Sequence, residues 1–158
     1  MIILTADQAT KKTGVCVMES ISRKLLYSTT IEEKDKNYFN RIYNMRNRIF
    51  DTFEKYKCEV ISFEGCTYQN NAQALIMLAQ LQGMILSTCM DKELLYIIPK
   101  ATEWRSICEF KGGRRDVQKQ LAIQFVKDKY DLDLSDKDDE AEAICLAWAI
   151  SEKHFKDR

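Results

Sequence analysis

The hydrophobic period of this sequence first changes after residue 31, and that change most constrains the fold. Before it, apolar residues come in short runs that predict strands over residues 2–8, 14–19 and 24–31, with a turn at 9–13. From 37 to 56, apolar side chains such as Phe39, Ile42 and Phe53 recur at helical spacing. The first third of the chain therefore predicts an antiparallel meander followed by a helix.

The rest of the chain alternates between the two periods. The apolar segments CEVISFEG and LLYIIP predict two further strands, and helices are expected over residues 71–90, 102–108, 114–129 and 138–155. This order predicts an α/β fold with a mixed five-stranded sheet, in which three antiparallel strands precede two reached by helical crossovers. A helical crossover makes the first and fourth strands natural neighbours.

Two of the predicted strands end in an acid. Asp7 closes the first strand and Glu64 closes the fourth, so the two carboxylates are expected at adjacent strand ends. If both were buried without a partner, they would cost several kcal/mol or become protonated. A cation between them removes that cost. The alternative is that each strand ends at the surface and its acid points into solvent.

The last predicted helix adds a second pair of acids. Asp139 and Glu142 are three residues apart, so they share a helix face, and Ala143 and Leu146 continue that face as apolar residues. These two acids should therefore point toward the sheet. The other acids near this helix start, Asp136, Asp138 and Glu140, are the kind that the helix dipole favours.

Four inward acids indicate a site for hard cations. The chain has a single histidine and no Cys/His cluster, which excludes a typical zinc site. Carboxylate oxygens suit Mg²⁺ or Mn²⁺. Two such ions about 3.5–4 Å apart can activate water and stabilise the leaving oxygen in phosphodiester hydrolysis.

Three segments resemble the acidic motifs of RuvC-type Holliday-junction resolvases, which have the ribonuclease H-like fold. These segments are ILTADQATKKTG, VISFEG with the Gln- and Ala-rich helix after it, and DDEAEAICLAWAI; PKATEWRS is most similar to the phage-encoded branch. By this resemblance Asp7 bridges both metals, Glu64 is the second acid, and Asp139 with Glu142 closes the site. The resemblance implies a Mg²⁺-dependent endonuclease with two ions per site, for which Mn²⁺ substitutes. It also implies paired nicks in four-way DNA junctions and 5′-phosphate ends.

The sequence departs from the family pattern at three places. Gln8 and Ala9 stand where Pro and Gly usually follow the first acid, so the turn must form without glycine. Glu142 stands where the last acid is usually Asp, which leaves open whether Asp138 assists it. The aromatic residue that wedges into the junction in cellular members has its nearest counterpart in Tyr68.

Charge is balanced overall but unevenly distributed. The formal net charge is zero, yet a basic stretch precedes the acidic run at the start of the last helix. With Tyr68, the expected DNA contacts in this stretch are Lys100, Arg105, Lys111, Arg114, Arg115 and Lys119. Each of these charges has the alternative of being a solvated surface group. Trp104 either stacks on a base or, as we expect, belongs to the core.

The helix predicted over 71–90 is apolar on more than one face, so we expect it to be buried on two sides. Its second partner is either the last helix of the same chain or, as we prefer, a second copy in a two-fold homodimer.

Length and cysteine usage set the remaining expectations. The 158 residues suit one nuclease domain over residues 1–158, and six dispersed cysteines favour reduced thiols in a cytoplasmic protein, in a bacterial host if phage-encoded. No membrane span is expected. Besides the junction nuclease, two functions stay open: a non-catalytic branched-DNA-binding protein of this fold, and an actin-like ATPase or sugar-kinase fragment.

Overall fold

The computed structural model describes residues 1–68 and 70–156, and it contains the predicted mixed sheet. The strand order is β3-β2-β1-β4-β5. The strands are β1 (Ile2–Asp7), β2 (Lys12–Glu19), β3 (Lys24–Glu32), β4 (Val60–Phe63) and β5 (Leu95–Ile97). The pairs β1–β2 and β2–β3 are antiparallel, whereas β1–β4 and β4–β5 are parallel. The fold class and the adjacency of the first and fourth strands are therefore confirmed.

Five helices complete the described fold. They are α1 (Tyr38–Lys55), α2 (Ala72–Asp91), α3 (Ala101–Ile107), α4 (Arg115–Tyr130) and α5 (Asp138–His154). Asn37 and Asn71 accept hydrogen bonds from backbone N–H groups in the first turns of α1 and α2, and so cap these helices. The expected bounds differ from these by one or two residues, mainly at turns. The second strand begins at Lys12, because β2 pairs with β3 as far as Glu32.

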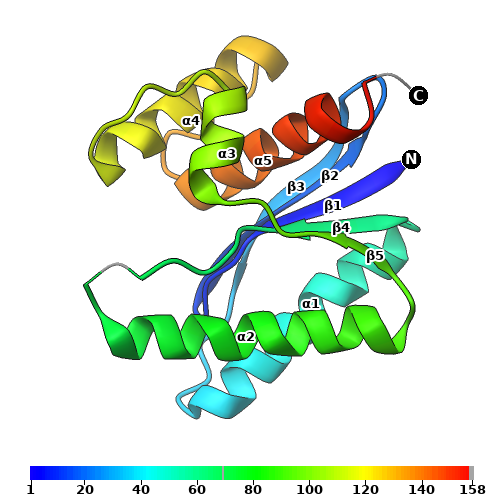
Figure 1. Cartoon of the computed structure of the whole chain (residues 1–158), viewed down its shortest axis with the longest axis vertical. Helices are drawn as coiled ribbons and strands as arrows, with labels where there is room; N and C mark the ends of the chain where they lie inside the picture. The colour runs from blue at the N-terminus through cyan, green and yellow to red at the C-terminus, as the bar shows by residue number, and fades with distance from the viewer. Residues whose placement is uncertain (69, 157–158) are drawn as a thin grey trace.

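Side chains alternate between the two faces of the sheet along each strand, so each face has its own hydrophobic core. Ile3 of β1 and Val60 of β4 pack with α3, α4 and α5, whereas their neighbours Leu4 and Ile61 pack with α1 and α2. In Figure 1, α1 and α2 accordingly lie on one side of the sheet and the other three helices on the opposite side. The proposal that α5 covers the second side of α2 is wrong, because the sheet lies between them.

The first turn of α5 lies directly against the sheet at Gly14. Gly14 is the β2 residue that pairs with Asp7 of β1. A Cβ atom at this position would overlap the backbone carbonyl of Asp139. Only a residue without a side chain lets the helix approach so closely, and this approach brings Asp139 beside Asp7.

The turn between β1 and β2 forms without a glycine. None of its residues has a positive φ. The hydroxyl of Thr13 accepts a hydrogen bond from the Ala9 N–H at 3.1 Å and donates one to the Ala9 carbonyl at 2.8 Å. The buried Gln8 side chain donates to the Glu64 carbonyl at 2.8 Å. Side-chain hydrogen bonds therefore hold this turn in place of the usual backbone freedom.

All six cysteines are free thiols, five of them buried, as expected. Among the described helices, α2 has the length and apolar composition that a membrane span requires, which was not expected from the sequence. A single such helix is weak evidence for a span, because length and composition are all that it rests on.

We expect Gly14→Ala to destabilise the fold, because the added methyl group forces α5 away from the sheet. Overpacking of this kind costs about 1–3 kcal/mol and occasionally more. Thermal unfolding measures the effect, with Gly112→Ala as the control, since a Cβ atom at Gly112 meets no atom within 4 Å. Equal unfolding midpoints for the two variants would contradict the close approach described here.

Candidate metal centre

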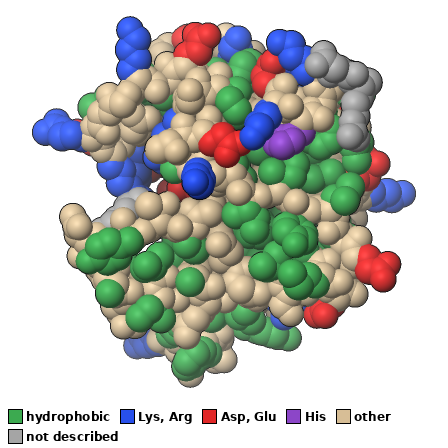
Figure 2. Space-filling view, in the orientation of Figure 1, with side chains coloured by type: hydrophobic (Ala, Val, Ile, Leu, Met, Phe, Trp, Pro, Cys, Tyr) green, Lys and Arg blue, Asp and Glu red, His purple; other side chains and the backbone are tan. Residues whose placement is uncertain are grey.

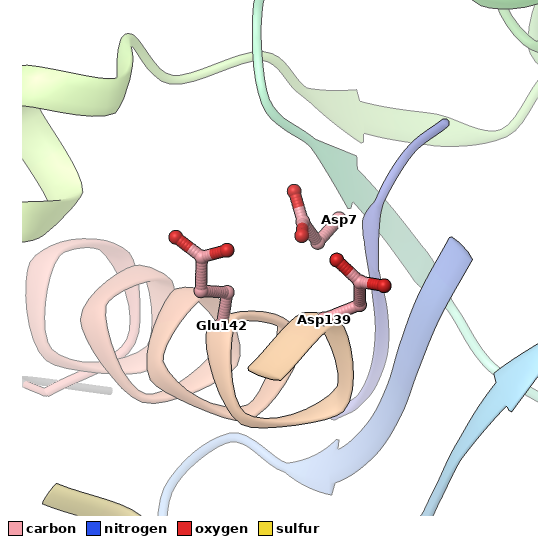
Figure 3. A group of neighbouring side chains, drawn as sticks. All are labelled: Asp7, Asp139 and Glu142. Carbon is pink, nitrogen blue, oxygen red and sulfur yellow. The ribbon is translucent and has the colours of Figure 1, made fainter. Parts of the chain in front are cut away.

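Three of the four predicted acids meet at one end of the sheet. Carboxylate oxygens of Asp7, Asp139 and Glu142 all lie within 4.8 Å of one another. Figure 3 shows Asp139 and Glu142 rising from the first turns of α5 toward Asp7 at the end of β1. The predicted pairing of Asp7 with the inward face of α5 is therefore present.

Strand alternation explains why the acids face α5. Counting from Ile3, the residues Thr5 and Asp7 point to the same side of β1, and Thr5 Oγ1 donates a 2.7 Å hydrogen bond to the Ala143 carbonyl of α5. Counting from Val60, Glu64 likewise follows on that side of β4. The parallel register pairs Ala6 with Phe63, so the two acids follow one position later on adjacent strands.

The electrostatics of the cluster favour a cation. Burial, and then the carboxylates of Glu142, Glu64 and Asp139, raise the pKa of Asp7 well above its usual value. Burial also raises the pKa of Asp139 and of Glu142, and Arg105 opposes the shift at Glu142. Close, partly desolvated oxygen donors fit a hard divalent ion, which would neutralise the charge that the fold concentrates here.

Glu64 borders this cluster but is not one of the three converging acids. Its Oε2 atom accepts a 2.6 Å hydrogen bond from the indole N–H of Trp104. Its backbone carbonyl accepts two more, from the amides of Gln8 at 2.8 Å and Gln82 at 2.9 Å. The side chain and backbone of Glu64 are thus held by neighbours from α2, α3 and the β1–β2 turn.

Two of the predicted DNA-binding cations are paired with acids of the site. Arg105 Nη2 lies 3.3 Å from Glu142 Oε1 and 3.9 Å from Glu64 Oε2. Lys119 forms an ion pair with Asp138. The Asp138 carboxylate therefore contacts α4. Among the described residues it is not one of the three carboxylates that converge.

Four other predicted DNA contacts are exposed residues of the connecting segments. Tyr68 is 59% exposed in the β4–α2 connection, beside residue 69, which lies outside the described residues. Lys100, Lys111 and Arg114 are exposed at the ends of α3 and α4. Trp104 is 2% exposed, so the expectation that it belongs to the core is confirmed.

A cleft of about 310 Å³ opens beside Asp7. Asp7, Gln8, Glu64 and Arg115 line one part of it, and Leu75 and Leu78 of α2 line another. The cleft therefore combines an acidic floor, a cation and an apolar wall.

Glu140, which the helix dipole seemed to explain, is instead buried and accepts a 2.6 Å hydrogen bond from Ser28 on β3.

Sequence reasoning missed the contacts of Trp104 and Arg105 with the acids. The residues are adjacent in the sequence, and no periodicity indicates that a short helix brings both against Glu64. The one available signal is that Trp104 and Arg105 lie between the second and third acidic motifs. On sequence grounds, that stretch had been assigned to DNA contacts.

We predict that Asp7→Asn stabilises the metal-free protein at pH 7. The raised pKa of Asp7 means that the fold disfavours its ionised form, a penalty absent below its ordinary pKa of 3.8 and growing as pH rises above it. The variant should therefore unfold at a higher temperature than the wild-type protein; for a chain of this size a rise of about 2–4 °C corresponds to about 1 kcal/mol. The gain should shrink as pH falls toward 3.8.

Thermal unfolding in chelator measures this gain, with Asp51→Asn on the exposed face of α1 as the control. A loss of stability for Asp7→Asn at pH 7 would show that the folded protein stabilises the ionised carboxylate.

Comparisons with known proteins agree with this architecture. Curated proteins give no match by sequence. The profile of the family described as crossover junction endodeoxyribonuclease RuvC matches residues 3–150. Among solved structures, Thermus thermophilus RuvC in complex with Holliday junction substrate is similar at TM-score 0.76 and 11% identity, over 94% of this chain and 92% of that chain.

Two further solved structures extend the likeness. Fowlpox virus resolvase, solved with substrate Holliday junction DNA, matches at TM-score 0.70 and 16% identity over 99% of this chain and 100% of that chain. The yeast mitochondrial Holliday junction resolvase matches at TM-score 0.61 and 16% identity, over 98% and 81%. At these identities the structures establish a shared ribonuclease H-like fold, and the family match goes further: the chain belongs to the RuvC family of crossover junction endodeoxyribonucleases.

Proposed function

We propose that this RuvC-family nuclease is a Mg²⁺-dependent, structure-selective endonuclease that resolves four-way DNA junctions by paired nicks and leaves 5′-phosphate ends. The observation that carries the proposal is the convergence of Asp7, Asp139 and Glu142, with Glu64 beside them, at one end of the sheet. Two of the solved structures, those of Thermus thermophilus RuvC and Fowlpox virus resolvase, contain Holliday junction DNA, which is the substrate class we extend to this chain.

The four acids have distinct positions in the proposed site. Asp7 is central, since its carboxylate interacts with each of the other three. Asp139 and Glu142 approach it from α5, and Glu64 from β4. Two Mg²⁺ ions, or Mn²⁺ in their place, would supply water activation and stabilisation of the leaving oxygen when bound.

The surroundings of the acids suit a nucleic-acid strand. The cleft beside Asp7 offers Arg115 for a phosphate and an apolar α2 wall for a sugar or base. Lys100, Lys111 and Arg114, which are exposed before α3 and between α3 and α4, would be further phosphate contacts. Such contacts bind phosphates without reading the base sequence.

The non-catalytic alternative gains no support from the altered turn. Gln8 and Ala9 replace the usual Pro and Gly, but hydrogen bonds from Gln8 and Thr13 close the turn and Asp7 still meets Asp139. The longer Glu142 also reaches the cluster. Membership of the RuvC family leaves the actin-like kinase alternative without support.

We also propose that the protein acts as a two-fold homodimer through the outer face of α1 and α2. A groove of about 500 Å³ runs between these helices, lined among others by Phe39, Gly83 and Met84. In Figure 2, hydrophobic side chains in green gather over the half of the molecule where Figure 1 places α2, whose one charged residue is Asp91. A partly apolar surface with few charges is typical of the core of an interface.

Cleavage of a labelled four-way junction tests the proposed function. We expect paired nicks in Mg²⁺, none in chelator, and no cutting of a linear duplex with the same arms. Asp7→Asn should bind the junction as tightly as the wild-type protein but lose cleavage by about three orders of magnitude or more, since its carboxylate is the central acid. Junction binding without cleavage in both Mg²⁺ and Mn²⁺ would favour the non-catalytic alternative.

Light scattering of the purified protein tests the dimer. We expect a dimer at micromolar concentration, and Ile76→Glu should convert it to a monomer, because Ile76 lies on the outer face of α2 and is 51% exposed. Ile21→Glu is the matched control, since Ile21 is 53% exposed at the opposite end of the sheet from Asp7. A monomeric wild-type protein, or a dimer unaffected by Ile76→Glu, would overturn this interface.

A further inference from the structure

Helix α3 contacts Glu64, the one predicted acid that is not part of the three-carboxylate cluster. Trp104 and Arg105 are consecutive on this short helix, and both contact Glu64. The indole N–H of Trp104 donates to Glu64 Oε2 at 2.6 Å. An indole has a single donor and no acceptor, so it fixes one carboxylate oxygen and leaves the second for another ligand.

The position of Trp104 is set by a chain of aromatic contacts through the core. Its ring meets Phe110 edge to face at 6.0 Å between centroids, Phe110 meets Phe125 at 5.9 Å, and Phe125 meets Trp148 at 5.2 Å. These contacts link α3 to α4 and α5. The indole donor therefore has little freedom to leave Glu64, because moving it would disrupt packing on two other helices.

Arg105 supplies the charge that the acids need in the metal-free protein. Its guanidinium lies 3.3 Å from Glu142 Oε1 and 3.9 Å from Glu64 Oε2, and it sits over the Trp104 ring at 4.9 Å. One side chain thus bridges the β4 acid and an α5 acid. A cation that bridges two carboxylates competes with any metal ion that both would bind.

We infer that Trp104 is the positioning residue of Glu64 and that Arg105 is its exchangeable counter-ion. Trp104 keeps the Glu64 carboxylate oriented toward the other acids whether or not metal is present, as hydrogen-bonding partners of metal ligands do. Arg105 holds Glu64 and Glu142 together until metal binds and then releases them. This inference rests on the proposed metal site, and it assigns the two residues opposite effects on metal affinity.

Calorimetric titration with MnCl₂ tests the opposite signs. Trp104→Phe keeps most of the aromatic packing but removes the donor, and it should weaken Mn²⁺ binding about 10-fold. Arg105→Gln removes the competing charge and should tighten Mn²⁺ binding. Trp148→Phe is the matched control, because it makes the same ring change at the far end of the aromatic chain and should leave the affinity unchanged.

The indole proton gives a readout that a general packing defect does not reproduce. The protein has two tryptophans, so a ¹H–¹⁵N spectrum contains two indole signals, and Trp148→Phe assigns them. We expect the Trp104 signal to be shifted by its carboxylate acceptor, to lose that shift in Glu64→Gln, and to respond when Mg²⁺ is added. A Trp104 signal unchanged in Glu64→Gln and in Mg²⁺ would overturn the positioning role.

The outcomes separate this inference from the proposed function. A wild-type protein that binds no Mn²⁺ contradicts the metal site itself. If wild-type protein binds Mn²⁺ and cleaves junctions while Trp104→Phe binds Mn²⁺ equally well, the inference about Trp104 alone fails. If Arg105→Gln weakens junction binding in chelator and leaves Mn²⁺ affinity unchanged, Arg105 is a phosphate contact and not a counter-ion.

Discussion

The contact of the first turn of α5 with β2 at Gly14 is the constraint on which the site depends. Because Gly14 has no side chain and pairs with Asp7, the helix backbone can lie almost on the strand. That approach places Asp139 and, one turn later, Glu142 beside an acid they would otherwise not reach. The fold thus uses a packing feature of its core to concentrate negative charge at one end of the sheet.

Residues around the acids offset part of the repulsion and desolvation that this negative charge brings. The pKa of Asp7 is raised although the chain has no net charge, because burial and the neighbouring carboxylates act locally. Arg105 and Lys119 offset part of the charge at Glu142 and Asp138. The basic segment between the last two acidic motifs therefore has two environments: some of its cations face the acids, while Lys111 and Arg114 face solvent.

Much of this arrangement follows from the sequence, for identifiable reasons. Strand alternation and the parallel crossover place Asp7 and Glu64 on one face at neighbouring strand ends, and helical spacing places Asp139 with Glu142. The hydrogen bond from Trp104 to Glu64 did not follow, since it is a long-range contact that no local pattern encodes. The buried Glu140 was likewise missed, because an acid in a first helical turn already has a sufficient local explanation.

The turn after Asp7 has a consequence for how the site can be transplanted. Its geometry is held by the Gln8 amide on the Glu64 carbonyl, which also accepts from Gln82 of α2. The spacing of the first two acids is thus a property of β1, β4 and α2 together and not of the first hairpin. A designer who grafts the β1–β2 hairpin onto another scaffold would carry over Asp7 and the Thr13–Ala9 hydrogen bonds, but would lose the Gln8 contact that ties the turn to the second acid.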